Sequence, residues 1–157
     1  GYRSVPAETG RSDATIQRNA LEICQHRAQQ PCYLYVVNDA VVWSEDDEAV
    51  AVEIQYGGAF DPSRIPFVSD KMREEGLLVH GRRGNPSVPF GEAPANRAFA
   101  MSALGIGHVW IDASTESVAR REALLRCTRF MREIGFDGPC FVYAINERVV
   151  FSPSDPL

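Results

Sequence analysis

An internal repeat constrains the fold of this chain more than any other feature. Residues 20–43 read ALEICQHRAQQPCYLYVVNDAVVW, and residues 123–151 read ALLRCTRFMREIGFDGPCFVYAINERVVF. Both copies contain A-L-x-x-C, a spacer, and then C-x-x-Y-x-x-N, followed by an acidic residue, any residue, V-V and an aromatic residue. All four cysteines of the chain lie inside this pattern. The repeated pattern predicts that one structural module occurs twice.

The first copy predicts a helix followed by a β-hairpin. Apolar residues recur at helical spacing over about 14–28, as they do on a helix with one buried face. Two runs rich in β-branched and aromatic residues follow at 33–37 and 41–43. Asn38 and Asp39 separate these runs, and both residue types tolerate the positive φ angles that a tight hairpin turn requires.

The second copy repeats this order with stronger signals. Its helix is predicted to begin after a capping residue, Ser114 or Thr115, and to end at Gly135. Between them lies an apolar stripe of Ala119, Ala123, Cys127, Phe130 and Ile134. A hairpin over 140–151 follows through Asn146 and Glu147. Because glutamate is unfavourable as the second residue of a primed two-residue turn, we expect a type I turn with a bulge here.

A further hairpin precedes the second helix. Residues 97–102 and 108–112 flank a glycine-containing turn at 104–107, so the second unit reads β-β-α-β-β over 97–151. The first copy has no clear leading hairpin of this kind, and residues 1–12 or a strand from 49–56 are the candidates to replace part of it.

The segment between the copies is less regular. Alternation predicts a strand at 49–56, a capped short helix at 69–75 and a strand at 77–80. Residues 81–96 contain three prolines and three glycines, which is typical of a long loop.

The sequence therefore predicts an α+β fold with two related units of the β-β-α-β-β type, the first incomplete, in which antiparallel hairpins pack on one helix each. The predicted organisation is a first helix-hairpin unit over 13–56, an irregular insert and linker over 57–96, and a second, complete unit over 97–151. Because isolated hairpins are marginally stable, the two copies either form separate lobes or share one sheet.

The cysteines predict two disulfides. Four cysteines allow three pairings, and the repeat selects Cys24 with Cys32 and Cys127 with Cys140, since each copy must satisfy its own pair. Each bond would join the end of a helix to the start of a hairpin and stabilise the fold by about 2.5–3 kcal/mol. The spacings differ from those of zinc sites and of redox C-x-x-C motifs, so reduced, buried cysteines are the alternative. Disulfides persist in oxidising compartments, and a periplasmic or secreted location is therefore expected.

Composition and charge exclude several classes of partner. The chain has 157 residues, a formal net charge of −5 and no basic stripe, which disfavours nucleic acid as a partner. It contains no run of 18 apolar residues, so no transmembrane segment is predicted. The start at Gly1 has no apolar signal region, and for an exported protein we expect this to be the mature form after signal-peptide removal.

Two charged surfaces are candidates for binding a partner. One is the acidic turn after the first hairpin, and the other is the arginine-rich exterior of the second helix; their residues are Glu45, Asp46, Asp47, Arg120, Arg121, Arg129 and Arg132. Solvated surface charge is the alternative interpretation of both. The aromatic residues matched between the copies, Tyr35 with Tyr143 and Trp43 with Phe151, are expected to pack in the core first, and any exposed member could anchor a protein interface.

Nothing in the sequence indicates a reaction. The histidines, His26, His80 and His108, are scattered without metal-ligand spacing. Signatures of serine hydrolases, zinc peptidases and kinases are absent. We therefore expect no catalytic, cofactor-binding or metal-binding residues, and no cofactor.

The motif nevertheless resembles a known pattern. A-L-x-x-C on a helix, then P-C-x-[LV]-Y-[AV]-[VI]-N-[DE]-x-V-V-[WF], preceded by R-A-F-A-M-S-A-L-G-I-G-H-V-W, is similar to the tandem repeat of small exported bacterial proteins in an uncharacterised domain-of-unknown-function family. The resemblance covers 16–43 and 97–151, with 65–70 also similar. It implies an exported, disulfide-bonded unit and no assigned catalytic residue.

These observations favour a non-catalytic exported binding module, or an accessory subunit of a periplasmic or envelope-associated complex, whose partner is another protein. One alternative is an inhibitor or immunity-type protein that inserts the 81–96 loop into an enzyme cleft. The other is a small metal-dependent hydrolase using His80, His108 and carboxylates.

Overall fold

The computed structural model describes residues 12–79 and 87–157 and confirms the α+β class. The described residues form three helices and eight short strands. Their order is α1 (Asp13–Ala28), β1 (Val36–Val37), β2 (Ala40–Val41), α2 (Asp70–Glu75), β3 (Leu78–Val79), β4 (Val88–Pro89), β5 (Ala98–Ser102), β6 (Gly107–Trp110), α3 (Glu116–Glu133), β7 (Cys140–Ile145) and β8 (Arg148–Val149). In the described segments, 3₁₀ turns lie at Pro62–Arg64 and Phe90–Glu92.

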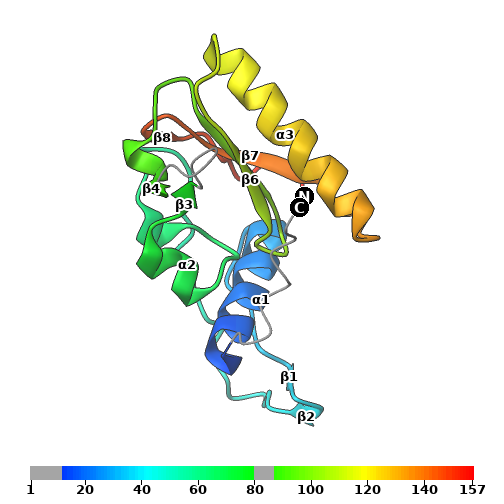
Figure 1. Ribbon diagram of the computed structural model, residues 1–157. Coiled ribbons are helices and arrows are strands. Elements are labelled where there is room, and N and C mark those ends of the chain that lie inside the picture. Colours follow the sequence, from blue (N-terminus) through cyan, green and yellow to red (C-terminus); the bar gives the residue numbers. More distant parts are fainter. Residues whose placement is uncertain (1–11, 80–86) are drawn as a thin grey trace.

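The second unit is built as its sequence predicts. Its four strands form one antiparallel sheet in the order β6-β5-β7-β8, and α3 crosses one face of this sheet (Figure 1). Ala98 and Ala100 of β5 pack against Ala119 and Ala123 of α3, and all four are fully buried. Small side chains on both elements let the helix lie close to the sheet.

Residues from the insert cover the other face of this sheet. Phe99, Met101 and Tyr143 point into a second cluster that contains Phe67 and Phe90 of the insert, each at most 1% exposed. The segment between the two copies therefore contributes to the core of the second unit. Every residue of β5 is buried as a result.

A buried carboxylate holds the insert against α1. Glu22 of α1 accepts a hydrogen bond from the backbone N–H of Phe67 at 2.6 Å and pairs with Nη2 of Arg73 at 2.7 Å. The side-chain amide of Asn19 donates to the Phe67 carbonyl at 2.9 Å. Phe67 has a φ of 64°, an unfavourable conformation for a bulky residue, and these bonds from α1 stabilise it.

Residues 49–56 do not form the predicted strand, but the predicted alternation of their side chains is present. Only Val50 forms a β-bridge, with Cys32. Further along, the Gln25 side chain takes the place of a neighbouring strand, because its amide donates to the Val52 carbonyl at 2.6 Å and accepts from the Val52 N–H at 2.8 Å. Alternate side chains such as Ile54 still reach the core.

The predicted turns and caps are confirmed with two refinements. Asn38 and Asp39 both have positive φ (48° and 65°), as the first hairpin requires. The second hairpin has a two-residue loop in which Asn146 alone has positive φ (51°), so the expected bulged turn is not formed. Thr115 caps α3 as predicted. The last buried residue of α3 is Met131, whereas Ile134, a residue of the predicted apolar stripe, is 48% exposed.

The strand predicted at 77–80 is present as β3, and most of the predicted 81–96 loop is structured where it is described. Leu78 pairs with Pro89 of β4, while Phe90 is fully buried. Residues 80–86 lie outside the described residues. Among the described residues, no helix has the length and apolar character needed to cross a membrane.

Replacing Glu22 should destabilise the whole fold. In Glu22→Gln the pair with Arg73, a side chain only 17% exposed, is lost, and an uncompensated buried charge costs about 3 kcal/mol. Urea unfolding followed by circular dichroism measures this change.

The matched control is Glu53→Gln. Glu53 pairs with Arg64 on the surface and its side chain is 78% exposed, so the expected loss is below about 1 kcal/mol. Equal losses for the two variants would contradict the role of Glu22.

Candidate functional site

The two copies share the same helix-hairpin module at both of its anchor points. Disulfides join Cys24 to Cys32 and Cys127 to Cys140, with Cα separations of 6.2 Å and 6.1 Å, so the predicted pairing is confirmed.

At the other end of each module, the turn asparagine binds the first residue of the helix. Asn38 donates to the Asp13 carboxylate at 3.2 Å, and Asn146 donates to Glu116 at 2.6 Å. Each hairpin is therefore tied to its helix at two equivalent points.

The equivalent aromatic side chains have opposite environments in the two copies. Phe141, Tyr143 and Phe151 of the second copy are 4%, 0% and 1% exposed. Their counterparts in the first copy are 51%, 60% and 37% exposed; they are Tyr33, Tyr35 and Trp43. The expectation of core packing therefore holds for the second copy and is wrong for the first.

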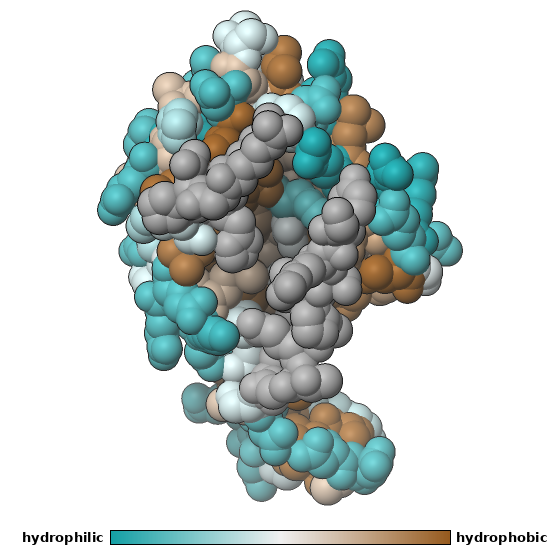
Figure 2. Space-filling model, in the orientation of Figure 1, coloured by the Kyte–Doolittle hydropathy of each residue, from teal (hydrophilic) through white to brown (hydrophobic). Residues whose placement is uncertain are grey.

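The reason for this difference lies in what covers each trio. The second trio is covered by Phe67 of the insert and by His26 of α1, whose ring stacks on Phe151 with centroids 4.9 Å apart. Burial also raises the pKa of the Tyr143 phenol well above its usual range. The first hairpin instead projects from the body of the molecule (Figure 1), where Figure 2 shows hydrophobic side chains framed by hydrophilic ones.

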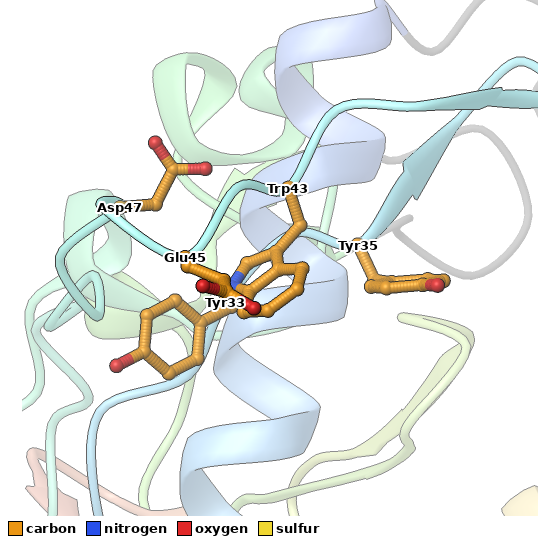
Figure 3. Close-up of a pocket in the computed structure, with 5 residues that line it drawn as sticks. All are labelled: Tyr33, Tyr35, Trp43, Glu45 and Asp47. Carbon is orange, nitrogen blue, oxygen red and sulfur yellow. The ribbon is translucent and has the colours of Figure 1, made fainter.

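The exposed aromatic trio lines a surface hollow of about 330 Å³ together with Glu45 and Asp47. Figure 3 shows the Trp43 indole between the two tyrosine rings, with the carboxylates on the chain that leaves β2. The rings of Tyr35 and Trp43 have centroids 6.0 Å apart. Asp47 accepts a hydrogen bond from the Ser44 N–H at 2.7 Å, which shapes this acidic turn. We name these five residues the aromatic hollow.

The helix of the first copy also exposes the face that its counterpart buries. In α3, Ala119, Ala123, Cys127 and Met131 are at most 1% exposed against the sheet. The equivalent residues of α1 are all exposed, with Ile16 at 54%; they are Ile16, Ala20, Cys24 and Ala28. α1 uses its opposite face, with Asn19, Glu22 and His26, to pack on the rest of the protein.

The predicted charged surfaces occupy separate elements. Glu45, Asp46 and Asp47 lie beside the aromatic trio and are exposed. The predicted arginines lie on the outer side of α3, where Arg121 pairs with Glu122 and Arg129 with Glu133; the four are Arg120, Arg121, Arg129 and Arg132. The structure therefore brings the acidic residues, and not the arginines, together with exposed aromatic side chains.

The histidines have structural surroundings where they are described. His26 is 3% exposed, with Nδ1 2.9 Å from the Tyr56 hydroxyl and Nε2 2.8 Å from the Asp155 carbonyl. His108 packs beside the Phe130 ring, and burial, followed by the nearby Arg126 charge, lowers its pKa. His80 lies outside the described residues. Within the described part of the chain, no group of three or more potential metal ligands comes together.

The chain matches no family model, and comparisons with curated proteins and with solved structures found no match. The resemblance of its repeat to an uncharacterised family of exported proteins therefore stays a prediction.

The contrast between the two trios predicts different effects of the same substitution. Tyr143→Ala removes a fully buried ring and its hydrogen bond to Gln55, and should cost about 3–5 kcal/mol. Tyr35→Ala removes a ring that is 60% exposed, and should cost less than about 1 kcal/mol. Thermal or urea unfolding of both variants measures the difference, and a large loss for Tyr35→Ala would show that its ring is covered within the chain.

Proposed function

We propose that this chain is a non-catalytic, exported protein-binding module, either free or as an accessory subunit of a periplasmic or envelope-associated complex. The observation that carries this proposal is the exposure of Tyr33, Tyr35 and Trp43 at positions whose counterparts in the same chain are buried. A surface that retains the composition of a core is suited to being covered by a partner.

The composition of this surface fits a protein partner. Tyrosine and tryptophan are enriched among residues that dominate binding free energy, because their rings bury much area at low entropic cost. The aromatic hollow combines them with Glu45 and Asp47 at its rim. A hydrophobic centre with a charged rim is the usual arrangement of a protein interface.

The disulfides support the exported location. Both join residues within one helix-hairpin module, and disulfides of this structural kind persist in oxidising compartments.

A thiol-trapping experiment tests the proposed location. Cells are quenched in acid, and the protein is treated with a maleimide reagent before and after reduction. We expect no cysteine to react before reduction and all four to react afterwards. Free thiols in the quenched protein would place it in a reducing compartment and contradict export.

Site-specific photocrosslinking tests the binding function. A benzoyl-phenylalanine residue at position 35 should crosslink a protein in the native cells, whereas the same residue at position 125 on α3 should not. Leu125 is a matched control because it is 57% exposed and Tyr35 is 60% exposed.

Specificity of this crosslink is checked within the aromatic hollow. Adding Trp43→Ser to the position-35 probe should abolish the crosslink, and the wild-type chain should co-elute with the captured protein in size-exclusion chromatography. A crosslink at position 125 alone would assign the partner surface to α3 and refute the proposal.

A further inference from the structure

The second unit shows what completes this module. Its β5 lies beside β7 in the sheet and contacts both the hairpin and the helix. β5 pairs with β7, and its Ala98 and Ala100 pack against α3. On the opposite face, Phe99 and Met101 of β5 lie in the cluster that contains Tyr143 and Phe151. Within the described residues, the first unit has the helix, the hairpin and both anchor points, but no strand in the position of β5.

The edge of β1 that corresponds to the β5-facing edge of β7 is open. Tyr35 accepts a hydrogen bond from Val42 on the β2 side, and successive residues of a strand direct their backbone groups to opposite sides. Leu34 and Val36 therefore direct theirs to the other side, where the structure gives them no partner among the described residues.

The residue at the start of this edge, Cys32, is already paired with Val50. Cys32 exchanges backbone hydrogen bonds with Val50 at 3.3 Å and 2.8 Å, just as Cys140 pairs with Ser102 at the end of β5. Beyond Cys32 no described residue pairs with this edge, so the position of an additional strand is defined at one end.

The turn of the first hairpin has an acidic residue, Asp39, that could bind the end of an added strand remote from Cys32. In the second unit, Asn146 and the backbone of Arg97 exchange hydrogen bonds at 3.1 Å and 3.0 Å. The Arg97 guanidinium also donates to Glu147 at 2.6 Å. The equivalent turn residues of the first unit are Asn38 and Asp39, and both are exposed.

We propose that a partner protein donates an antiparallel β-strand to the open edge of β1, between the exposed face of α1 and the aromatic hollow. This inference rests on the proposed function and specifies how the partner binds. The donated strand has small residues at the alternate positions that meet Ala20 and Cys24, and large apolar residues at those that meet Tyr35 and Trp43. An arginine or lysine precedes it and pairs with Asp39. Its pattern is therefore that of residues 97–101, RAFAM, because Val50 already fills the position equivalent to Ser102.

Charge and pairing favour a different protein over a second copy as the donor. The described strand of this chain with the required pattern is β5, which is already paired with β6 and β7. Two β1 edges pairing with each other would supply no basic residue for Asp39, and would bring large side chains such as Leu34 against the small-residue face of α1.

A synthetic peptide with the sequence of residues 95–101 tests the inference directly. It ends at Met101, before the position that Val50 already fills, and is labelled with a fluorophore at its N-terminus. Fluorescence anisotropy with the full chain should show saturable binding. A peptide with Ala98→Leu and Ala100→Leu should bind at least tenfold more weakly, because leucine is too large for the gap over Ala20 and Cys24.

Variants of the protein locate the peptide on the proposed edge. Val36→Pro removes an outward backbone N–H, and Ala20→Glu places a charge on the exposed face of α1; each should weaken peptide binding at least tenfold. Asp39→Asn should weaken it severalfold and reduce its salt dependence. Ala20 is exposed, so Ala20→Glu keeps the test valid if Val36→Pro disturbs the hairpin. Leu125→Glu on α3 is the control and should leave the affinity unchanged.

The outcomes separate this inference from the function on which it rests. Absence of binding at millimolar peptide, or binding that both Val36→Pro and Ala20→Glu leave unchanged, overturns strand donation. If the position-35 crosslink nevertheless persists in Ala20→Glu, the chain binds a protein by another mode and the proposed function stands. Either a homodimer that Val36→Pro dissociates, or peptide binding that occurs only after residues 1–11 are removed, would overturn the assignment of the donor to a different protein.

Discussion

The structure depends on covering both faces of one sheet. Strand β5 has no solvent-facing side, because α3 packs on one face through alanine and the insert packs on the other through phenylalanine. Burying apolar surface at about 25 cal/mol per Å² is the main source of stability for such an arrangement. Both copies of the repeat have the same apolar pattern. In the part of the chain that the structure describes, one copy has this burial and the other does not.

The insert explains why the second unit is the one that is covered. Glu22 and Asn19 of α1 bind its backbone at Phe67 and hold this part of the insert against the core. α1 therefore turns its polar buried face toward the insert and leaves its small-residue face outward. The exposure of α1 and the coverage of the second trio have the same cause.

Local features of the fold were predictable from the sequence, whereas burial was not. Helix ends, the Asn38-Asp39 turn and the disulfide pairs depend on neighbouring residues, and they follow from capping, turn and repeat patterns. Tyr35 and Tyr143 occupy identical local patterns, so only contacts distant in the sequence decide which is covered. The 49–56 segment shows the same limit, because its alternation is visible in the sequence and the Gln25 amide that replaces its strand partner is not. The aromatic hollow combines a predicted acidic turn with aromatic exposure that no local pattern reveals.

His26 links parts of the molecule that are far apart in the sequence. It lies on α1, stacks on Phe151 and contacts the Tyr56 hydroxyl and the Asp155 carbonyl. Because α1 belongs to the first module and also packs on the core of the second, unfolding of this helix would expose that core. Any free energy gained by covering the outer face of α1 is therefore shared with the core of the second unit through thermodynamic linkage. A strand bound as proposed should therefore slow hydrogen exchange in the second module, which it does not contact.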